Sequence, residues 1–123
     1  MSLTKQAGMV KKLAQLTKEG LIDWKSSLNQ SSFQVSFRDN TVRITTRDRD
    51  DEVDILIQLL NGNGEIVEIF SDVDLGNIST ESGQTWFNLT QELLENARRK
   101  ALGADKVLDE IIADLDKADD IPF

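Results

Sequence analysis

The densest group of residues that could do chemistry is a run of carboxylates near the middle of the chain. A turn that brings several carboxylate oxygens together can bind a hard cation such as Ca²⁺ or Mg²⁺. Two arginines are interleaved with the acids in this run: Asp48, Asp50, Asp51, Glu52 and Asp54, with Arg47 and Arg49. The spacing departs from the EF-hand pattern, since neither the glycine at the sixth position from Asp48 nor the glutamate at the twelfth is present. We interpret the run Asp48–Asp54 as a solvated loop and keep a metal-binding or hydrolytic site there as an alternative.

A second pair of carboxylates, Asp72 and Asp74, precedes Gly76 and also suggests a cation loop. The glycine stands fifth instead of sixth, and the twelfth position is Gly83, which has no side chain to ligate with. General acid–base chemistry would need two carboxylates facing each other across a cleft, as in glycosidases. Because the chain has 22 acidic residues, the sequence does not say which of them converge. The pair Asp72/Asp74 therefore belongs to the same alternative.

Three residue types are missing, and their absence excludes most catalytic machinery. The chain has no His, no Cys and no Tyr. It lacks a Ser-His or Cys-His nucleophile pair, an imidazole metal ligand, a zinc finger and a disulfide. The sequence therefore identifies no catalytic, cofactor-binding or metal-ligating residue, and we expect a protein that is not an enzyme.

Two short motifs suggest a phosphate or nucleic-acid ligand, and both have simpler explanations. The segment Gly62–Gly64 is followed by a strand pattern, whereas phosphate loops lead into the first turn of a helix. The basic triplet Arg98–Lys100 falls in the last turn of a predicted helix, where cations interact favourably with the helix dipole. A nucleic-acid patch would need more positive neighbours, so we expect no nucleic-acid partner.

Tryptophan is enriched in binding hot spots, so Trp24 and Trp86 could anchor an interface. Both stand in phase with apolar neighbours, and this position favours a place in the core. We therefore predict that removing the Trp86 side chain destabilises the fold by about 3–5 kcal/mol.

Helical periodicity marks three segments that would position these residues. The first runs from about Leu3 to Lys18, the second from about Gly83 to Leu102, and the third begins near Asp105. The second and third are separated by Gly103, and the third carries an apolar stripe: Val107, Leu108, Ile111, Ile112 and Leu115. Residues 116–123 would form an acidic tail.

Period-two alternation marks four strands joined by short links, which indicates an antiparallel meander. The strands cover about residues 32–37, 41–45, 53–60 and 65–70, and the links are Asp39–Asn40, Arg47–Glu52 and Asn61–Gly64. We expect an α+β fold with an amino-terminal helix, a four-stranded antiparallel meander and two carboxy-terminal helices packed on one sheet face. That face would carry apolar side chains from the first two strands: Phe33, Val35, Phe37, Val42 and Ile44. We predict that residues 1–123 form a single domain, because one core suffices for this length.

Three parts of the chain together resemble small bacterial proteins of about this length. They are the run Leu16–Trp24, the predicted meander, and the run Ala97–Asp109 with its Arg98-Arg99-Lys100 triplet. The resemblance implies a bacterial origin. It implies no activity and no site residue.

Charge is distributed unevenly along the chain, whose net charge is −8. Residues 1–30 carry five lysines against two acids, and residues 103–123 carry seven acids against two lysines. The acidic regions would repel phosphate backbones and anionic membranes and attract a basic partner.

From these features we expect a cytoplasmic, non-catalytic protein–protein interaction module of the adaptor, chaperone or immunity-protein kind. It would bind a protein with a basic surface through its acidic carboxy-terminal helix or an exposed strand edge, and a homodimer would cover open sheet edges. It would have no membrane partner, because no apolar run approaches the length of a membrane span. A nucleic-acid mimic is a further alternative, since the clustered acids could occupy a basic groove.

Overall fold

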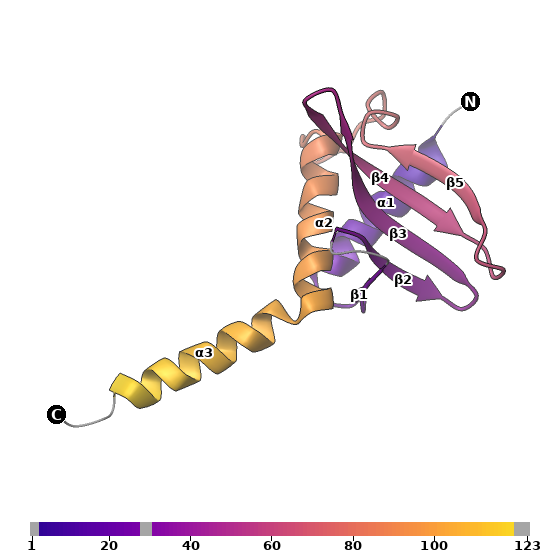
Figure 1. Ribbon diagram of the computed structural model, residues 1–123. Helices are drawn as coiled ribbons and strands as arrows, with labels where there is room; N and C mark the ends of the chain where they lie inside the picture. The colour runs from indigo at the N-terminus through magenta and orange to yellow at the C-terminus, as the bar shows by residue number, and fades with distance from the viewer. Residues whose placement is uncertain (1–2, 28–30, 120–123) are drawn as a thin grey trace.

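Five antiparallel strands form one sheet, and two helices cover one of its faces in the computed structural model, which describes residues 3–27 and 31–119 (Figure 1). A third helix projects from this body. In chain order the elements are α1 (Thr4–Lys18), β1 (Lys25–Ser26), β2 (Phe33–Phe37), β3 (Asn40–Arg49), β4 (Glu52–Leu60), β5 (Ile66–Ser71), α2 (Trp86–Leu102) and α3 (Ala104–Asp119). The predicted α+β class is confirmed.

The sheet is a meander with the strand order β1-β2-β3-β4-β5, and every pair is antiparallel. It has one strand more than predicted. The additional strand, β1, contains only two residues, Lys25 and Ser26, which are both exposed. So short a polar segment has no alternating pattern, and the sequence therefore offered no signal for it.

One row of apolar side chains crosses the sheet and forms the centre of the core. Phe33, Ile44, Ile57 and Phe70 lie in register on β2 to β5, and all four are buried. Side chains from α1 and α2 pack against this row and its neighbours. The predicted core face is confirmed except at Phe37, which is 44% exposed because β2 ends there.

The opposite face of the sheet is polar near its centre. Gln34, Arg43 and Gln58 lie side by side on β2, β3 and β4, and the Arg43 guanidinium donates hydrogen bonds to both glutamine oxygens. β5 is the last strand at its end of the sheet, and Val67 and Ile69 on it are exposed.

The charged stretch Arg47–Glu52, predicted as a loop, belongs to strands and a tight turn. β3 continues to Arg49, which pairs with Glu52 at the start of β4. Only Asp50 and Asp51 lie in the turn, and both have positive φ, 45° and 68°. Two consecutive residues of this kind are typical of the type I′ turn that matches the twist of a hairpin.

α2 begins at Trp86, three residues later than the predicted start at Gly83. The Thr85 hydroxyl accepts a hydrogen bond from the backbone N–H of Asn88, so Thr85 is the N-cap of the helix. The core positions predicted for Trp24 and Trp86 are confirmed. Each indole N–H has a partner, the Thr17 hydroxyl for Trp24 and the Ile78 carbonyl for Trp86.

The prediction that both carboxy-terminal helices pack on the sheet is wrong for α3. None of its residues is buried, and it points away from the body (Figure 1). α1 and α2 already fill the apolar face of the sheet, so α3 has no room on it. The helix also continues to Asp119 through residues predicted as an acidic tail; residues 120–123 of that tail lie outside the described part of the chain.

Candidate protein-docking site

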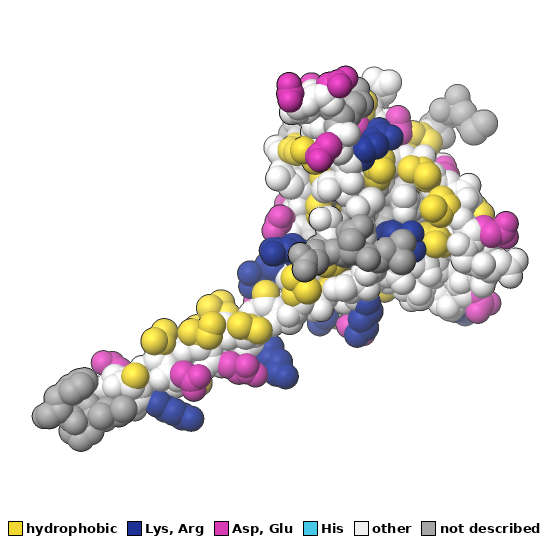
Figure 2. Space-filling model, in the orientation of Figure 1, with side chains coloured by type: hydrophobic (Ala, Val, Ile, Leu, Met, Phe, Trp, Pro, Cys, Tyr) yellow, Lys and Arg dark blue, Asp and Glu magenta, His cyan; other side chains and the backbone are white. Residues whose placement is uncertain are grey.

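α3 is an amphipathic helix whose apolar side is exposed. Five aliphatic side chains on it are between 46% and 63% exposed: Val107, Leu108, Ile111, Ile112 and Leu115. They recur at spacings of one, three and four residues and therefore form one stripe along the helix. Figure 2 shows this stripe along the projecting helix. Contiguous exposed apolar surfaces are typical of interaction sites, so the stripe is the candidate docking surface.

A single glycine separates this helix from the body. Gly103 has the left-handed conformation, with φ 67° and ψ 38°, and its N–H donates to the carbonyls of Arg99 and Lys100. This arrangement ends α2, and α3 begins at the next residue in a new direction. The junction is also held by a hydrogen bond from Arg99 Nη2 to Asp105 Oδ1, in the first turn of α3.

Acidic residues border the apolar stripe on both sides. At 100° per residue, Asp105 and Asp116 fall along one border, and Asp114, with Glu110 beyond it, falls along the other. Lys106 and Lys117 lie on the opposite side of the helix from the stripe. A partner that covers the stripe would therefore meet carboxylates at both borders, and its lysine or arginine side chains would be favoured there.

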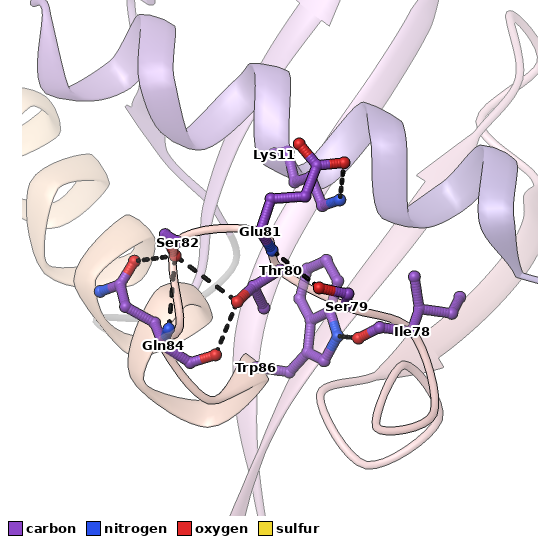
Figure 3. A network of polar contacts seen from close by, with 8 residues as sticks. All are labelled: Lys11, Ile78, Ser79, Thr80, Glu81, Ser82, Gln84 and Trp86. Carbon is purple, nitrogen blue, oxygen red and sulfur yellow. Dashed lines mark hydrogen bonds and ion pairs between the residues drawn. The ribbon is translucent and has the colours of Figure 1, made fainter.

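A separate hollow of about 660 Å³ lies between α1, α2 and the 79–85 segment, and a polar network forms one wall (Figure 3). Thr80 Oγ1 donates to the Gln84 carbonyl at 2.7 Å, and the Glu81 N–H donates to Ser79 Oγ at 3.1 Å. Lys11 Nζ lies 3.4 Å from Glu81 Oε1. The first two contacts are local and order the 79–85 segment itself, and the Lys11–Glu81 ion pair joins it to α1. We therefore assign the network to holding this segment against α1.

The acids of the Asp48–Asp54 run do not converge. Asp54 is 3% exposed, and its Oδ2 lies 3.0 Å from Arg47 Nη2. Asp48 pairs with Val53 in the ladder between β3 and β4, and Asp50 and Asp51 form the turn. Within residues 3–27 and 31–119, no three acidic side chains are grouped as cation ligands.

Asp72 and Asp74 have structural partners in the turn that follows β5. Asp72 Oδ1 accepts a hydrogen bond from the Ile55 N–H at 2.9 Å, and Asp74 Oδ2 accepts one from the Ser71 N–H at 2.9 Å. Side chains of Asp commonly satisfy backbone donors in turns this way. Each carboxylate is therefore directed at backbone, and the pair fixes the end of β5 against β4.

No family model, no curated protein and no solved structure matches this chain. In the described part of the chain, every helix is too short or too polar to cross a membrane.

Proposed function

We propose that this protein is a non-catalytic protein-binding module and that α3 is its recognition element. The observation that carries the proposal is the free apolar stripe of α3, on a helix that buries none of its own residues. Helices with apolar residues at such spacings bind by inserting that side into a groove of another protein. The acidic borders of the stripe favour a partner whose groove has a basic rim. We place this activity in the bacterial cytoplasm, on the basis of composition and resemblance.

The alternatives have less support. A carboxylate enzyme or metal site would need converging acids, whereas Asp54, Asp72 and Asp74 each engage an arginine or a backbone N–H. A nucleic-acid mimic would display carboxylates in place of phosphates, yet one whole side of α3 carries exposed aliphatic side chains. The exposed edge strand β5 presents fewer apolar side chains than the α3 stripe.

Capture of partners from a bacterial lysate tests the proposal when three forms of the full chain are compared. Ile111→Asp places a charge within the stripe, and Ala113→Asp places the same charge on the opposite side of α3. We expect the wild-type protein and Ala113→Asp to retain the same partner, and Ile111→Asp to lose it. The captured protein is then identified and its affinity measured in purified form.

Two results would contradict the proposal. One is a specific partner that Ile111→Asp binds as tightly as the wild-type protein does. The other is a preparation of the purified chain, with no added protein, that hydrolyses a substrate and loses this activity when Asp72 or Asp74 is replaced by Asn.

A further inference from the structure

An apolar hollow of about 310 Å³ lies on the body, between α1 and the hairpin of β2 and β3. Leu13, Ile22 and Val42 are buried and form its floor. Its walls are the half-buried Met9 and Leu16 of α1 and the exposed Phe37 of β2. The volume is about twice the roughly 150 Å³ that the loss of one core leucine leaves in a protein, so it has room for about two aliphatic side chains. We call this hollow the α1 groove.

The rim of the α1 groove is basic. Among the described residues that line it, Lys12 is the one that carries a charge. Lys5 lies seven residues earlier on α1 and therefore on the same side of the helix, and both lysines are exposed. Two of the five lysines in the first 30 residues, Lys5 and Lys12, are thus placed beside an apolar depression.

The α1 groove and the α3 stripe have complementary properties. The groove is apolar with a lysine rim, and the stripe is apolar with acidic borders. We propose that the α1 groove binds α3 of a second copy of this chain, and that two copies exchange their α3 helices to form a symmetric dimer. Leu108, Ile111 and Leu115 follow the centre line of the stripe, and two of them, Ile111 and one neighbour, would enter the groove. This inference rests on the proposed role of α3 as the recognition element.

Direct pairing of two α3 helices would be less favourable than docking of α3 in the α1 groove. In either orientation, a helix whose two borders are acidic brings carboxylates next to carboxylates. Docking within one chain is also disfavoured, because only Gly103 joins α2 to α3 and its conformation directs α3 away from the body. An exchange between two copies buries both apolar surfaces twice and generates a closed twofold dimer.

The first test is sedimentation velocity of the purified full chain over a range of concentrations. We expect a dimer whose dissociation constant rises about a hundredfold or more in Ile111→Asp, since two buried isoleucines are lost per dimer. Ala113→Asp should leave the constant unchanged. Lys12→Glu should raise it about tenfold, whereas Lys18→Glu, on the other flank of α1, should not.

The second test mixes two variants that are each expected to be monomeric. Phe37→Glu damages the groove and leaves α3 intact, whereas Ile111→Asp damages α3 and leaves the groove intact. Because one undamaged helix can still enter one undamaged groove, the mixture should form a heterodimer at concentrations where each variant alone is monomeric. Circular dichroism and thermal melts establish that both variants fold.

The outcomes separate this inference from the proposed function. A wild-type protein that stays monomeric at all concentrations overturns the exchange, while capture of another protein by the α3 stripe remains a separate result. A wild-type dimer in which Phe37→Glu still dimerises on its own also overturns the exchange, because pairing of α3 with α3 does not need the groove. Two monomeric variants that form no heterodimer when mixed overturn it as well. Met9 gives a direct readout: in the exchanged dimer, its methyl NMR signal should shift on dilution of the wild-type protein and stay constant in Ile111→Asp.

Discussion

Replacement of Trp86 by Ala should remove a large part of the stability of the fold. The indole is 5% exposed in the core, and its N–H donates a hydrogen bond of 2.7 Å to the Ile78 carbonyl. Truncation of a buried Trp to Ala costs about 3–5 kcal/mol. Domains of this size have unfolding free energies of about 5–15 kcal/mol, so the variant would be marginally stable. Trp86→Phe should cost less than Trp86→Ala, because the ring still fills most of the site, although the Ile78 carbonyl loses its donor.

Urea denaturation followed by far-ultraviolet circular dichroism measures these changes, and Trp24 supplies an independent fluorescence signal. The matched control is Phe87→Ala at the next position of α2, where the ring is 38% exposed. A partly exposed ring contributes less to the free energy of unfolding, so we expect Phe87→Ala to lower it by about 1–2 kcal/mol. The reasoning is refuted if Trp86→Ala unfolds at the same urea concentration as the wild-type protein, or if Phe87→Ala is the more damaging change.

Three further changes test other parts of the structure. Arg47→Ala removes the cation beside the buried Asp54 carboxylate and should cost about 1–2 kcal/mol in urea denaturation; an unchanged midpoint would show that the ion pair contributes nothing. The double change Asp50→Asn with Asp51→Gly should raise the free energy of unfolding by about 0.5–1 kcal/mol, because both residues have positive φ; a lower melting temperature would contradict the assigned turn. Gly103→Ala places a Cβ on a left-handed residue at a cost of about 1–2 kcal/mol, so we expect small-angle scattering to report a changed angle between α2 and α3, and an identical profile would contradict this.

The sheet and the packed helices could be predicted because their residues repeat with clear periods. Alternation over the β2–β3 hairpin predicts both strands and their inward side, and the buried Phe33 and Ile44 confirm it. β1 could not be predicted, since its place depends on pairing with β2 and not on its own residues. Composition predicts a loop for the charged stretch before β4, because charged residues indicate exposure. It does not indicate backbone conformation, and charged side chains can stand on the ends of paired strands.

The position of α3 could not be predicted for a different reason. An amphipathic pattern shows that one side of a helix favours an apolar environment, but it does not show which surface supplies it. The core was already complete without α3, a fact that depends on how α1 and α2 share the sheet. Two sequence features indicate a helix that lies outside the core. They are Gly103, which ends α2, and the acids on both borders of the stripe. The acids at the alternative metal sites suggest cation ligands, but carboxylates also accept hydrogen bonds from backbone N–H groups in turns, as Asp72 and Asp74 do here.

Gly103 also determines the direction in which the carboxy-terminal helix leaves the body. The apolar positions Ala97 and Ala101 of α2 and Ala104, Leu108 and Ile111 of α3 follow one another at intervals of three or four residues. On an uninterrupted helix they would form one continuous seam. The left-handed residue divides this seam, so that the first part lies in the core and the second lies outside it. Since α3 is about 24 Å long, the two dihedral angles of a single residue determine where the far end of the arm, and anything bound to it, is held.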